Sequence, residues 1–274
     1  MSMTEHHHHA LLYLTADSMT AAGGVVHAFS TRQGGVSEGI YTSLNLGANR
    51  GDDPARVRQN YHILCSAIGI SPSCLVFSKQ VHGDQIRVVT ASDAGKGLDR
   101  PVDYEADGLI CDDPNAALVV FSADCIPILL YDPVRGAIGA VHAGWRGTAL
   151  GIAAKAVNKM SAVFGCQPAH ILAAIGPGLS QCCFETDEDV PAAMWAALGT
   201  DAAPYLAQQG IKWHVDLKGL NRQFLQNAGV QPDHISISAD CTRCLPDRYW
   251  SHRVTGNQRG SQAALIQLIK KESV

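Results

Sequence analysis

Long hydrophobic runs and an excess of basic charge are both absent from this chain of 274 residues. No apolar segment approaches the roughly 20 residues that a membrane-spanning helix needs, and the N-terminus lacks the basic-then-apolar pattern of a secretory signal. The formal net charge is -4, so there is no overall positive field to hold nucleic acid. We therefore expect a cytoplasmic protein that acts on small molecules, with neither a membrane nor a nucleic acid as its partner.

The chain also lacks internal repeats, low-complexity linkers and the cysteine pattern of a disulfide framework. Its nine cysteines are an odd number spread through a long sequence, which is typical of free thiols in a reducing compartment. A hydrophobic content of 46% is enough for one large core. We predict a disordered segment over 1–22, where His6 to His9 form a tag or a native tail, and one catalytic domain over 23–274.

Hydrophobic periodicity predicts an α+β fold with a mixed sheet. Apolar residues at three-and-four spacing predict a helix over 52–70, and similar patterns predict helices over 149–165, 185–198, 216–229 and 260–272. Short apolar runs predict strands over 23–32, 74–80, 85–91, 116–123, 126–132, 137–144, 170–178 and 234–240. Brief polar turns between successive strands indicate hairpins rather than β-α-β units.

Two short motifs are interpreted as structural. Residues 35–39 (GVSEG) match the Gly-x-Ser-x-Gly pattern of a nucleophile elbow, but no helical periodicity follows them. Residues 241–244 (CTRC) form one Cys-x-x-Cys pair, with no second pair to complete a zinc knuckle and no following helix to favour redox chemistry. The zinc-deaminase signature and the His-Glu-x-x-His motif are absent. Any catalytic metal must therefore use another set of ligands.

Three residues stand at the edges of apolar runs: His82, Cys125 and His142. Two imidazoles and a thiolate leave one tetrahedral position open on zinc, which is the composition of a catalytic zinc site. The same residues are also compatible with ordinary core packing, or with a Cys125-His142 dyad in a metal-free cysteine hydrolase. Their spacing does not separate these alternatives.

Charged neighbours add chemistry to this region. Asp124 lies beside an apolar strand, where a carboxylate without a partner is costly, so it needs a hydrogen-bond donor, a cation or a role in proton transfer. Arg146 lies at a predicted helix start, where free amides favour a phosphate or carboxylate; a surface arginine on a turn is the alternative. Cys183 follows the predicted strand 170–178 and either faces the same pocket or packs as a small hydrophobe.

Blocks throughout the chain resemble the YfiH family, also called the multicopper polyphenol oxidase or laccase-domain family. They run in order from Val26 to the C-terminal segment and include STRQGGVSEGIYTSLNLG, GDDPARVRQN, KQVHGD, EADGLI, SADCIPILLYDP, AVHAGWRGT, IGPGLSQCCFE, VDLKGLN and CTRC. The resemblance implies a layered α/β/β/α sandwich similar to the catalytic domain of cytotoxic necrotizing factors. It also implies a zinc ion bound by His82, Cys125 and His142.

One block departs from the family pattern. The segment SHRVTGNQRGSQAALI is similar to the family's Ser-Tyr/His-Arg-Arg-Asp segment, but Val254 and Thr255 replace the second arginine and the aspartate. Any role that the resemblance assigns to Arg253 therefore needs support from the structure.

The resemblance implies a purine nucleoside phosphorylase that acts on adenosine, inosine and methylthioadenosine, with an additional adenosine deaminase activity. The expected roles are proton transfer by Asp124, phosphate placement by Arg146 and Arg32, and hydrogen bonds to ribose or base from Asn45 or Gln80.

Several alternatives stay open. A cysteine hydrolase could edit peptidoglycan precursors, and a zinc-stabilised binding module would have no turnover. A multicopper oxidase is the weak alternative, because outside the N-terminal cluster the chain has eight histidines and no His-x-His pair. Copper could nevertheless replace zinc at such ligands, since Cu²⁺ binds nitrogen and sulfur more tightly.

Overall fold

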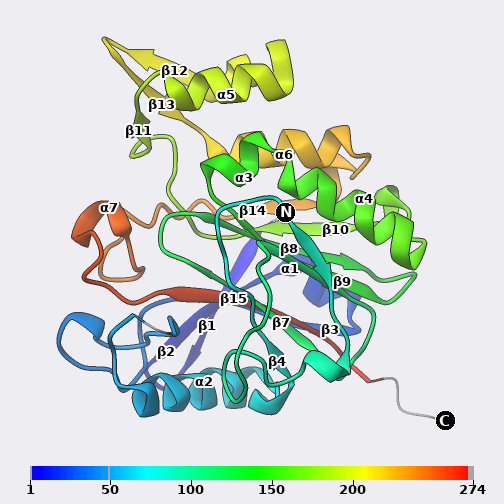
Figure 1. Cartoon of the computed structure of the whole chain (residues 1–274), viewed down its shortest axis with the longest axis vertical. Coiled ribbons are helices and arrows are strands. Elements are labelled where there is room, and N and C mark those ends of the chain that lie inside the picture. Colours follow the sequence, from blue (N-terminus) through cyan, green and yellow to red (C-terminus); the bar gives the residue numbers. More distant parts are fainter. Residues whose placement is uncertain (1, 49, 271–274) are drawn as a thin grey trace.

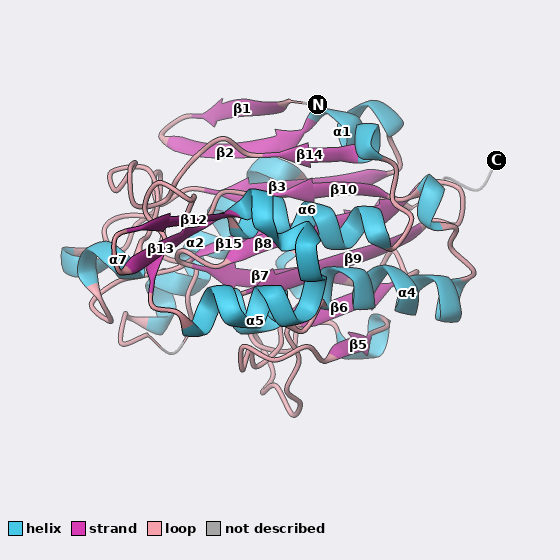
Figure 2. Ribbon diagram, turned by 90° about the horizontal axis from the view of Figure 1, so that it is seen from above, coloured by secondary structure: helices cyan, strands magenta, loops and turns pink. Residues whose placement is uncertain are grey.

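The computed structural model describes residues 2–48 and 50–270, and their strands form two six-stranded sheets and one small sheet (Figures 1 and 2). In spatial order, the first sheet contains β1 (Met3–His8), β2 (Leu11–Ala16), β3 (Val25–Ser30), β15 (Gln262–Leu268), β7 (Ala117–Ser122) and β4 (Leu75–Val76). The second contains β14 (Ile235–Ile237), β10 (Leu172–Ile175), β8 (Ile126–Asp132), β9 (Ala137–Ala143), β6 (Gly108–Cys111) and β5 (Ile86–Val88). The small sheet contains β11 (Glu185–Thr186), β13 (Lys212–Val215) and β12 (Leu206–Gln209).

Helices cover the outer faces of the two large sheets (Figure 1). Helix α2 (Pro54–Ile68) packs on the first sheet, whereas α4 (Ile152–Phe164) and α6 (Leu217–Asn227) pack on the second. The others are α1 (Asp17–Ala22), α3 (Trp145–Ala149), α5 (Asp189–Leu198) and α7 (His252–Thr255), with 3-10 helices at Gly39–Tyr41, Pro72–Cys74, Ala91–Asp93, Pro168–His170, Gly199–Tyr205 and Pro232–His234. No helix within the described ranges is long and apolar enough to cross a membrane.

Alternating side chains along the strands divide the core into layers. In β7, Leu118 and Val120 pack between the two large sheets, while Ala117 and Val119 pack toward α2. Strands β8 and β10 divide their side chains in the same way between the other sheet and α4. This alternation follows from the two-residue period of a strand that is buried on both faces. The result is a helix, sheet, sheet, helix arrangement, and the predicted α+β fold with mixed sheets is confirmed.

Helix α2 shows how local sequence signals set element boundaries. The Asp53 side chain accepts a hydrogen bond from the backbone N–H of Ala55 at 2.8 Å, and Pro54 occupies the first turn, where its missing N–H costs nothing. Gly69 ends the helix with φ of 77°, a left-handed conformation that glycine adopts without strain. The helix predicted over 52–70 is therefore confirmed.

The prediction of a disordered segment over 1–22 is wrong for the described residues. Strand β1 pairs antiparallel with β2 along its whole length, and the ring of His6 stacks on Tyr13 at 5.0 Å. Glu5 forms an ion pair with Arg248 at 2.6 Å. Strand β2 buries Leu11 and neighbouring apolar residues in the core, which fixes an edge onto which the polar β1 can pair. The histidine cluster thus belongs largely to an edge strand.

The predicted helix over 260–272 is also wrong, since residues 262–268 form β15. This strand lies between β3 and β7 and pairs antiparallel with both. Its sequence QAALIQL is buried almost throughout, and a short run that is apolar on both faces does not distinguish strand from helix by periodicity. Residues 271 and 272 of that prediction lie outside the described ranges.

The hairpin prediction is confirmed for β8 and β9, which pair in register from Ile126 with Ala143 to Asp132 with Ala137. It fails for three other strands, because β4 pairs parallel with β7, β5 with β6, and β10 with β14. The β8-β9 hairpin forms the centre of the second sheet and carries two of the predicted metal ligands at its open end.

Burial of His27 in β3 predicts acid sensitivity. Its Nε2 accepts the backbone N–H of Ala16 at 2.8 Å, and burial lowers the pKa of His27 from 6.5 to about 4. The unfolded chain therefore binds this proton first as pH falls, so stability is complete above 6.5 and is lost as pH falls toward 4. The loss should be at most about 3 kcal/mol.

Urea unfolding of wild type and His27→Gln across this pH window measures that contribution. Glutamine keeps a hydrogen-bond acceptor without titrating, so its free energy of unfolding should fall less with acid than that of wild type. The matched control is His62→Gln, at an exposed position of α2, which should behave as wild type. Equal acid sensitivity in all three proteins would contradict the prediction that His27 contributes to the loss of stability in acid.

Candidate active site

His82, Cys125 and His142 meet at one end of the second large sheet. Cys125 directly precedes β8, His142 lies in β9 opposite Pro127, and His82 comes from the segment between β4 and β5. Their ligand atoms all lie within 4.8 Å of one another, and the two imidazole rings are 4.9 Å apart at 83°. The structure therefore brings together the three residues that the sequence singled out.

A glycine makes room for this cluster. A Cβ atom on Gly144 would lie 3.1 Å from Cδ2 of His82 and 3.2 Å from Sγ of Cys125. Both contacts are tighter than side chains normally make, so a larger residue would push the thiol or the imidazole out of place. His82 itself has φ of 61°, a left-handed conformation that is rare outside glycine.

The carboxylate of Asp107 holds both histidines of the cluster in place. It is fully buried just before β6, and its carboxylate accepts backbone N–H groups from Val81 at 3.1 Å, His82 at 3.0 Å and Gly83 at 2.8 Å. The same carboxylate contacts Nδ1 of His142 at 2.8 Å. With Nδ1–H donating to Asp107, Nε2 of His142 is left to face the thiol. Asp107 was not among the site residues predicted from the sequence.

Charge attraction between the thiol and the imidazole governs the ionisation of this cluster. Burial alone would raise the pKa of Cys125, but attraction to His142 and hydrogen bonds from both histidines outweigh it and lower that pKa. Burial likewise opposes protonation of His142, but Cys125 and Asp107 raise the pKa of His142 above its usual value. The site therefore favours a thiolate, which is the form that binds metal or acts as a nucleophile.

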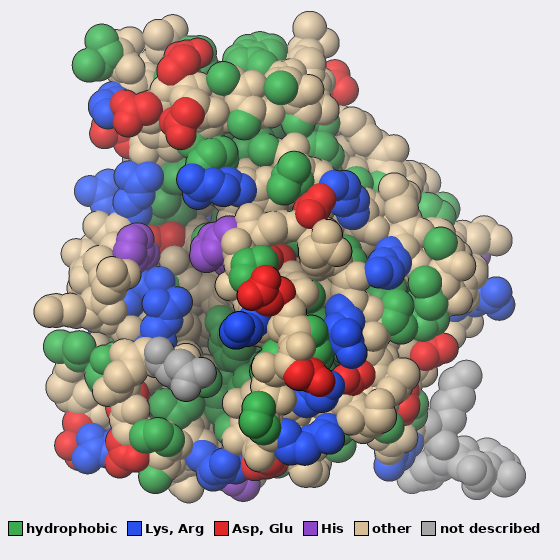
Figure 3. Space-filling model, viewed as in Figure 1, with side chains coloured by type: hydrophobic (Ala, Val, Ile, Leu, Met, Phe, Trp, Pro, Cys, Tyr) green, Lys and Arg blue, Asp and Glu red, His purple; other side chains and the backbone are tan. Residues whose placement is uncertain are grey.

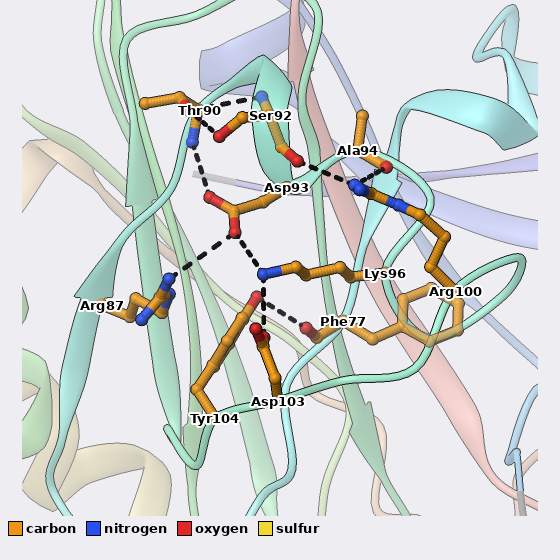
Figure 4. A network of polar contacts seen from close by, with 10 residues as sticks. All are labelled: Phe77, Arg87, Thr90, Ser92, Asp93, Ala94, Lys96, Arg100, Asp103 and Tyr104. Atoms are coloured by element: carbon orange, nitrogen blue, oxygen red, sulfur yellow. Dashed lines mark hydrogen bonds and ion pairs between the residues drawn. The ribbon is translucent and has the colours of Figure 1, made fainter.

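A polar network orders the chain that leads to Asp107 (Figure 4). Asp93 is buried, accepts a hydrogen bond from Lys96 Nζ at 3.0 Å, and lies 3.6 Å from the Arg87 guanidinium. Lys96 also reaches Asp103 at 2.8 Å, and Tyr104 packs beneath the guanidinium of Arg87. Although burial opposes it, the hydrogen bond from Lys96 lowers the pKa of Asp93. This network fixes the long connection between β5 and β6.

The cluster opens into a cavity of about 400 Å³. Figure 3 shows a hollow on this face of the molecule, with histidine and basic side chains gathered around it. The lining residues are Arg50, Gln80, His82, Phe121, Ser122, Ala123, Asp124, Cys125, His142, Trp145, Leu179, Phe184, Leu217, His252, Arg253, Asn257, Arg259 and Ser261. The volume is within the range of small-molecule sites, and the lining combines aromatic walls with several cations.

Arg259 is the most deeply buried of the lining arginines. It is 7% exposed, its Nη1 donates to the carbonyl of Gly260 at 2.9 Å, and its Nε has no hydrogen-bond partner among the described residues. Burial lowers the pKa of Arg259 to about 10, which leaves it charged at neutral pH. A buried cation with an unused donor is costly unless an anion binds beside it. Arg259 was not among the site residues predicted from the sequence.

Arg253 contributes a second cation from α7. Its backbone N–H donates to Asp124 Oδ2 at 2.7 Å, and its guanidinium donates to the carbonyl of Glu185 at 2.9 Å. Val254, which replaces the family's second arginine, is half exposed on the same helix. Arg253 thus faces the cavity even though the residues after it depart from the family pattern.

Asp124 lies in the cavity wall with both oxygens hydrogen-bonded. Oδ1 accepts from the Thr242 hydroxyl at 2.6 Å, and Oδ2 accepts the Arg253 N–H. Its backbone has φ of 87°, a strained conformation for a residue with a side chain. The structure therefore supplies the partners that the sequence analysis required for this carboxylate.

Gln80 lines the cavity, but its amide already exchanges two hydrogen bonds with the backbone of Phe121, at 2.8 and 2.7 Å. Arg146 is not among the lining residues. Helix α3 is only one turn long, and the Arg146 guanidinium lies over the ring of Trp145 at 4.2 Å in an exposed position. The prediction that Arg146 faces the pocket is corrected in favour of a surface arginine.

Three further predicted substrate contacts lie outside the cavity. Arg32 stacks on Trp250 at 3.9 Å and donates to backbone carbonyls. Asn45 is fully buried and donates to Asp52 at 2.9 Å. Cys183 packs against other cysteines instead. In each case the side chain is already engaged by other residues of the fold.

A family model described as multi-copper polyphenol oxidoreductase laccase matches residues 26–269. The chain belongs to this family. It is 40% identical over 239 residues to purine nucleoside phosphorylase SCO2081 of Streptomyces coelicolor, covering 86% of this chain and 94% of that protein. It is 35% identical over 246 residues to purine nucleoside phosphorylase YfiH of Shigella flexneri, covering 90% and 95%.

The family fold is also shared with a solved structure. The crystal structure of YlmD from Geobacillus stearothermophilus matches with a TM-score of 0.92 and 32% identity, covering 98% of this chain and all of that one. The predicted membership of the YfiH family is therefore confirmed.

Substitution of Asp107 should disturb both histidines at once. In Asp107→Asn the amide NH₂ meets backbone N–H donors, so at least one buried donor loses its acceptor, at a cost of about 1–3 kcal/mol. Zinc affinity should fall roughly 10–100-fold, because the orientation of His142 is lost. Urea unfolding of the metal-free protein and zinc titration against a competing chelator measure the two effects.

The matched control is Asp84→Asn in the same segment, which removes a partly exposed ion pair with Lys155. Such pairs contribute little, so its stability and zinc affinity should stay near wild type. Equal effects of the two substitutions would contradict the role assigned to Asp107.

Proposed function

We propose that this protein is a zinc-dependent purine nucleoside phosphorylase. The observation that carries the proposal is the buried cation of Arg259 in the same cavity as the His82, Cys125 and His142 cluster. The names of the curated relatives support the reaction class. In this reaction a phosphate oxygen attacks C1′ of the ribose, the glycosidic bond breaks, and the base leaves with the bonding electrons and takes up a proton.

The cavity offers each part of these substrates a suitable surface. Phe121, Trp145 and Phe184 provide aromatic walls for a purine. Arg259 and Arg253 place positive charge for phosphate, and they replace Arg146 and Arg32 in the role expected from sequence. Adenosine, inosine and methylthioadenosine are the proposed nucleosides.

The residues present fit a zinc ion. Two imidazole nitrogens and a thiolate within 4.8 Å form a three-ligand set with one position open. A zinc ion held there supplies Lewis-acid catalysis. Asp107 keeps His142 in the tautomer that binds metal, and copper could occupy the same ligands where it is available.

Adenosine deamination is the second proposed activity. It requires a group that moves a proton, and we assign this role to Asp124. Each of its oxygens accepts one hydrogen bond, from Thr242 or from Arg253, and a carboxylate oxygen can accept a second; Asp124 also lines the cavity.

One observation favours a competing function. Cys125, His142 and Asp107 are linked in the order nucleophile, base and orienting carboxylate, with a thiolate favoured. A cysteine hydrolase would use this arrangement without a metal. It leaves His82 and the buried cation of Arg259 without a role, so we place it second.

Incubation of the purified protein with adenosine, with and without phosphate, tests the proposed reaction. Phosphate-dependent release of adenine and ribose 1-phosphate supports the phosphorylase, and release of inosine supports the deaminase. Absence of all three products would overturn the nucleoside assignment.

Arg259→Met should lower kcat/KM for phosphorolysis by roughly 10²–10³-fold, as expected when one preorganised charge donor is removed. The KM for phosphate should rise with it. Arg146→Met, an exposed arginine outside the cavity, is the matched control and should keep its activity within about twofold by the same argument. Similar losses of activity in both variants would contradict the assignment of Arg259 to the phosphate site.

Removal of metal separates the two functions. Dialysis against a strong chelator should abolish phosphorolysis, and added zinc should restore it, because Cys125 and the two histidines then bind metal. Cys125→Ala should resist rescue by zinc. Full activity of the chelated protein, followed by loss on alkylation of Cys125, would instead favour the cysteine hydrolase.

A further inference from the structure

Four cysteines form a second cluster outside the cavity. Cys182 and Cys183 lie between β10 and β11, and Cys241 and Cys244 lie between β14 and α7. Their Sγ atoms all lie within 4.8 Å of one another. Cys241 is buried, Cys183 is half-buried, and Cys182 and Cys244 are exposed. None of these residues lines the cavity described above.

Three of the sulfur-sulfur separations are close to those of a tetrahedral metal site. Cys182 Sγ lies 3.7 Å from both Cys183 Sγ and Cys244 Sγ, and Cys183 Sγ lies 3.4 Å from Cys244 Sγ. Four thiolates bound tetrahedrally to one zinc ion, each at about 2.3 Å, have sulfur-sulfur separations of about 3.8 Å. The four cysteines are free thiols and not disulfides. The separations among Cys182, Cys183 and Cys244 are therefore close to those of ligands around a single ion, and the Cys241 sulfur lies within 4.8 Å of each of them.

The surrounding structure holds the two segments together. The backbone N–H of Thr242 donates to the carbonyl of Gly178 at 3.2 Å, and the N–H of Ser180 donates to Cys241 Sγ at 3.4 Å. An N–H that donates to sulfur stabilises a thiolate, as hydrogen bonds around metal ligands do. These backbone contacts hold the two cysteine pairs next to each other.

A buried lysine supplies compensating charge. Lys218 is 5% exposed, and its Nζ donates to Ser180 Oγ at 3.1 Å, Ser238 O at 3.0 Å and Asp240 O at 2.7 Å. These partners flank Cys182 and Cys241 in the chain. Four thiolates and one Zn²⁺ carry a net charge of about -2, so a fixed cation beside them offsets part of that charge.

We propose that Cys182, Cys183, Cys241 and Cys244 bind a structural zinc ion, separate from the metal of the cavity. Thiolates select soft and borderline ions, and four of them leave no position open for substrate or water. A mononuclear site fits the sulfur separations, whereas an iron-sulfur cluster would hold its cysteines farther apart around its sulfide ions. The two exposed cysteines give the ion a path of entry.

The site would clamp two walls of the cavity. The first cysteine pair lies between Leu179 and Phe184, which both line the cavity. The second pair flanks Thr242, whose hydroxyl donates to Asp124 at 2.6 Å. Zinc bound by the cysteines would therefore fix the positions of Asp124 and of the cavity wall at Phe184 relative to each other, from outside the cavity.

Zinc stoichiometry tests this inference without relying on enzyme activity. After saturation with zinc and desalting, wild type should retain two equivalents by elemental analysis. Cys182→Ser, Cys244→Ser and Cys125→Ala should each retain one, and Cys125→Ala combined with Cys244→Ser should retain none. Cys74→Ser, which removes a partly exposed cysteine far from both clusters, is the matched control and should retain two.

A second measurement covers the case in which a variant fails to fold. Wild type loaded with cobalt should show the intense charge-transfer absorption of a tetrathiolate site, and this band should persist in Cys125→Ala. The inference is overturned if Cys244→Ser keeps as much zinc as wild type, if the cobalt band is lost with Cys125, if iron occupies the cysteines, or if they form a disulfide in the zinc-treated protein. Because Cys125→Ala removes the cavity metal alone, failure of this site and failure of the phosphorylase proposal are distinguishable.

Discussion

The buried carboxylate of Asp107 is the interaction on which the active site depends. It binds the segment of His82 through three backbone N–H groups and His142 through a ring nitrogen, so one side chain fixes two imidazoles from different parts of the chain. A carboxylate buried in this way is stable only while all its donors are present. The position of each histidine is therefore linked to that of the other, whether or not a metal is bound.

The fold class was predictable from the sequence, whereas the structure of segments that depend on pairing with distant strands was not. Helix α2 was predictable because Asp53, Pro54 and Gly69 mark its ends with local chemistry. Strand β15 was not predictable, since a buried apolar run of seven residues is compatible with a helix or a strand. Its pairing with β3 and β7 is what makes it a strand. The polar β1 was missed for the opposite reason, because its order comes entirely from the strand it pairs with.

The site shows the same division. His82, Cys125 and His142 were selected as chemically suitable residues, and the family resemblance supplied their grouping, because their spacing is too wide to predict contact. Asp124 was noticed because it is a charged residue next to a buried strand. Asp107 also directly precedes a buried strand, so the same argument could have identified it. Arg259 had no local signal, since it lies in the loop between α7 and β15 and its burial depends on the tertiary packing of the cavity wall.

The β8-β9 hairpin has a consequence for the order in which the site assembles. Cys125 and His142 are 17 residues apart and meet as soon as the hairpin closes, whereas His82 lies a further 43 residues upstream of Cys125. By chain entropy alone, closing the longer loop costs about 0.8 kcal/mol more. Two of the three ligands therefore come from the most local contact in the second sheet, and early folding events can bring these two together before the remaining strands pair.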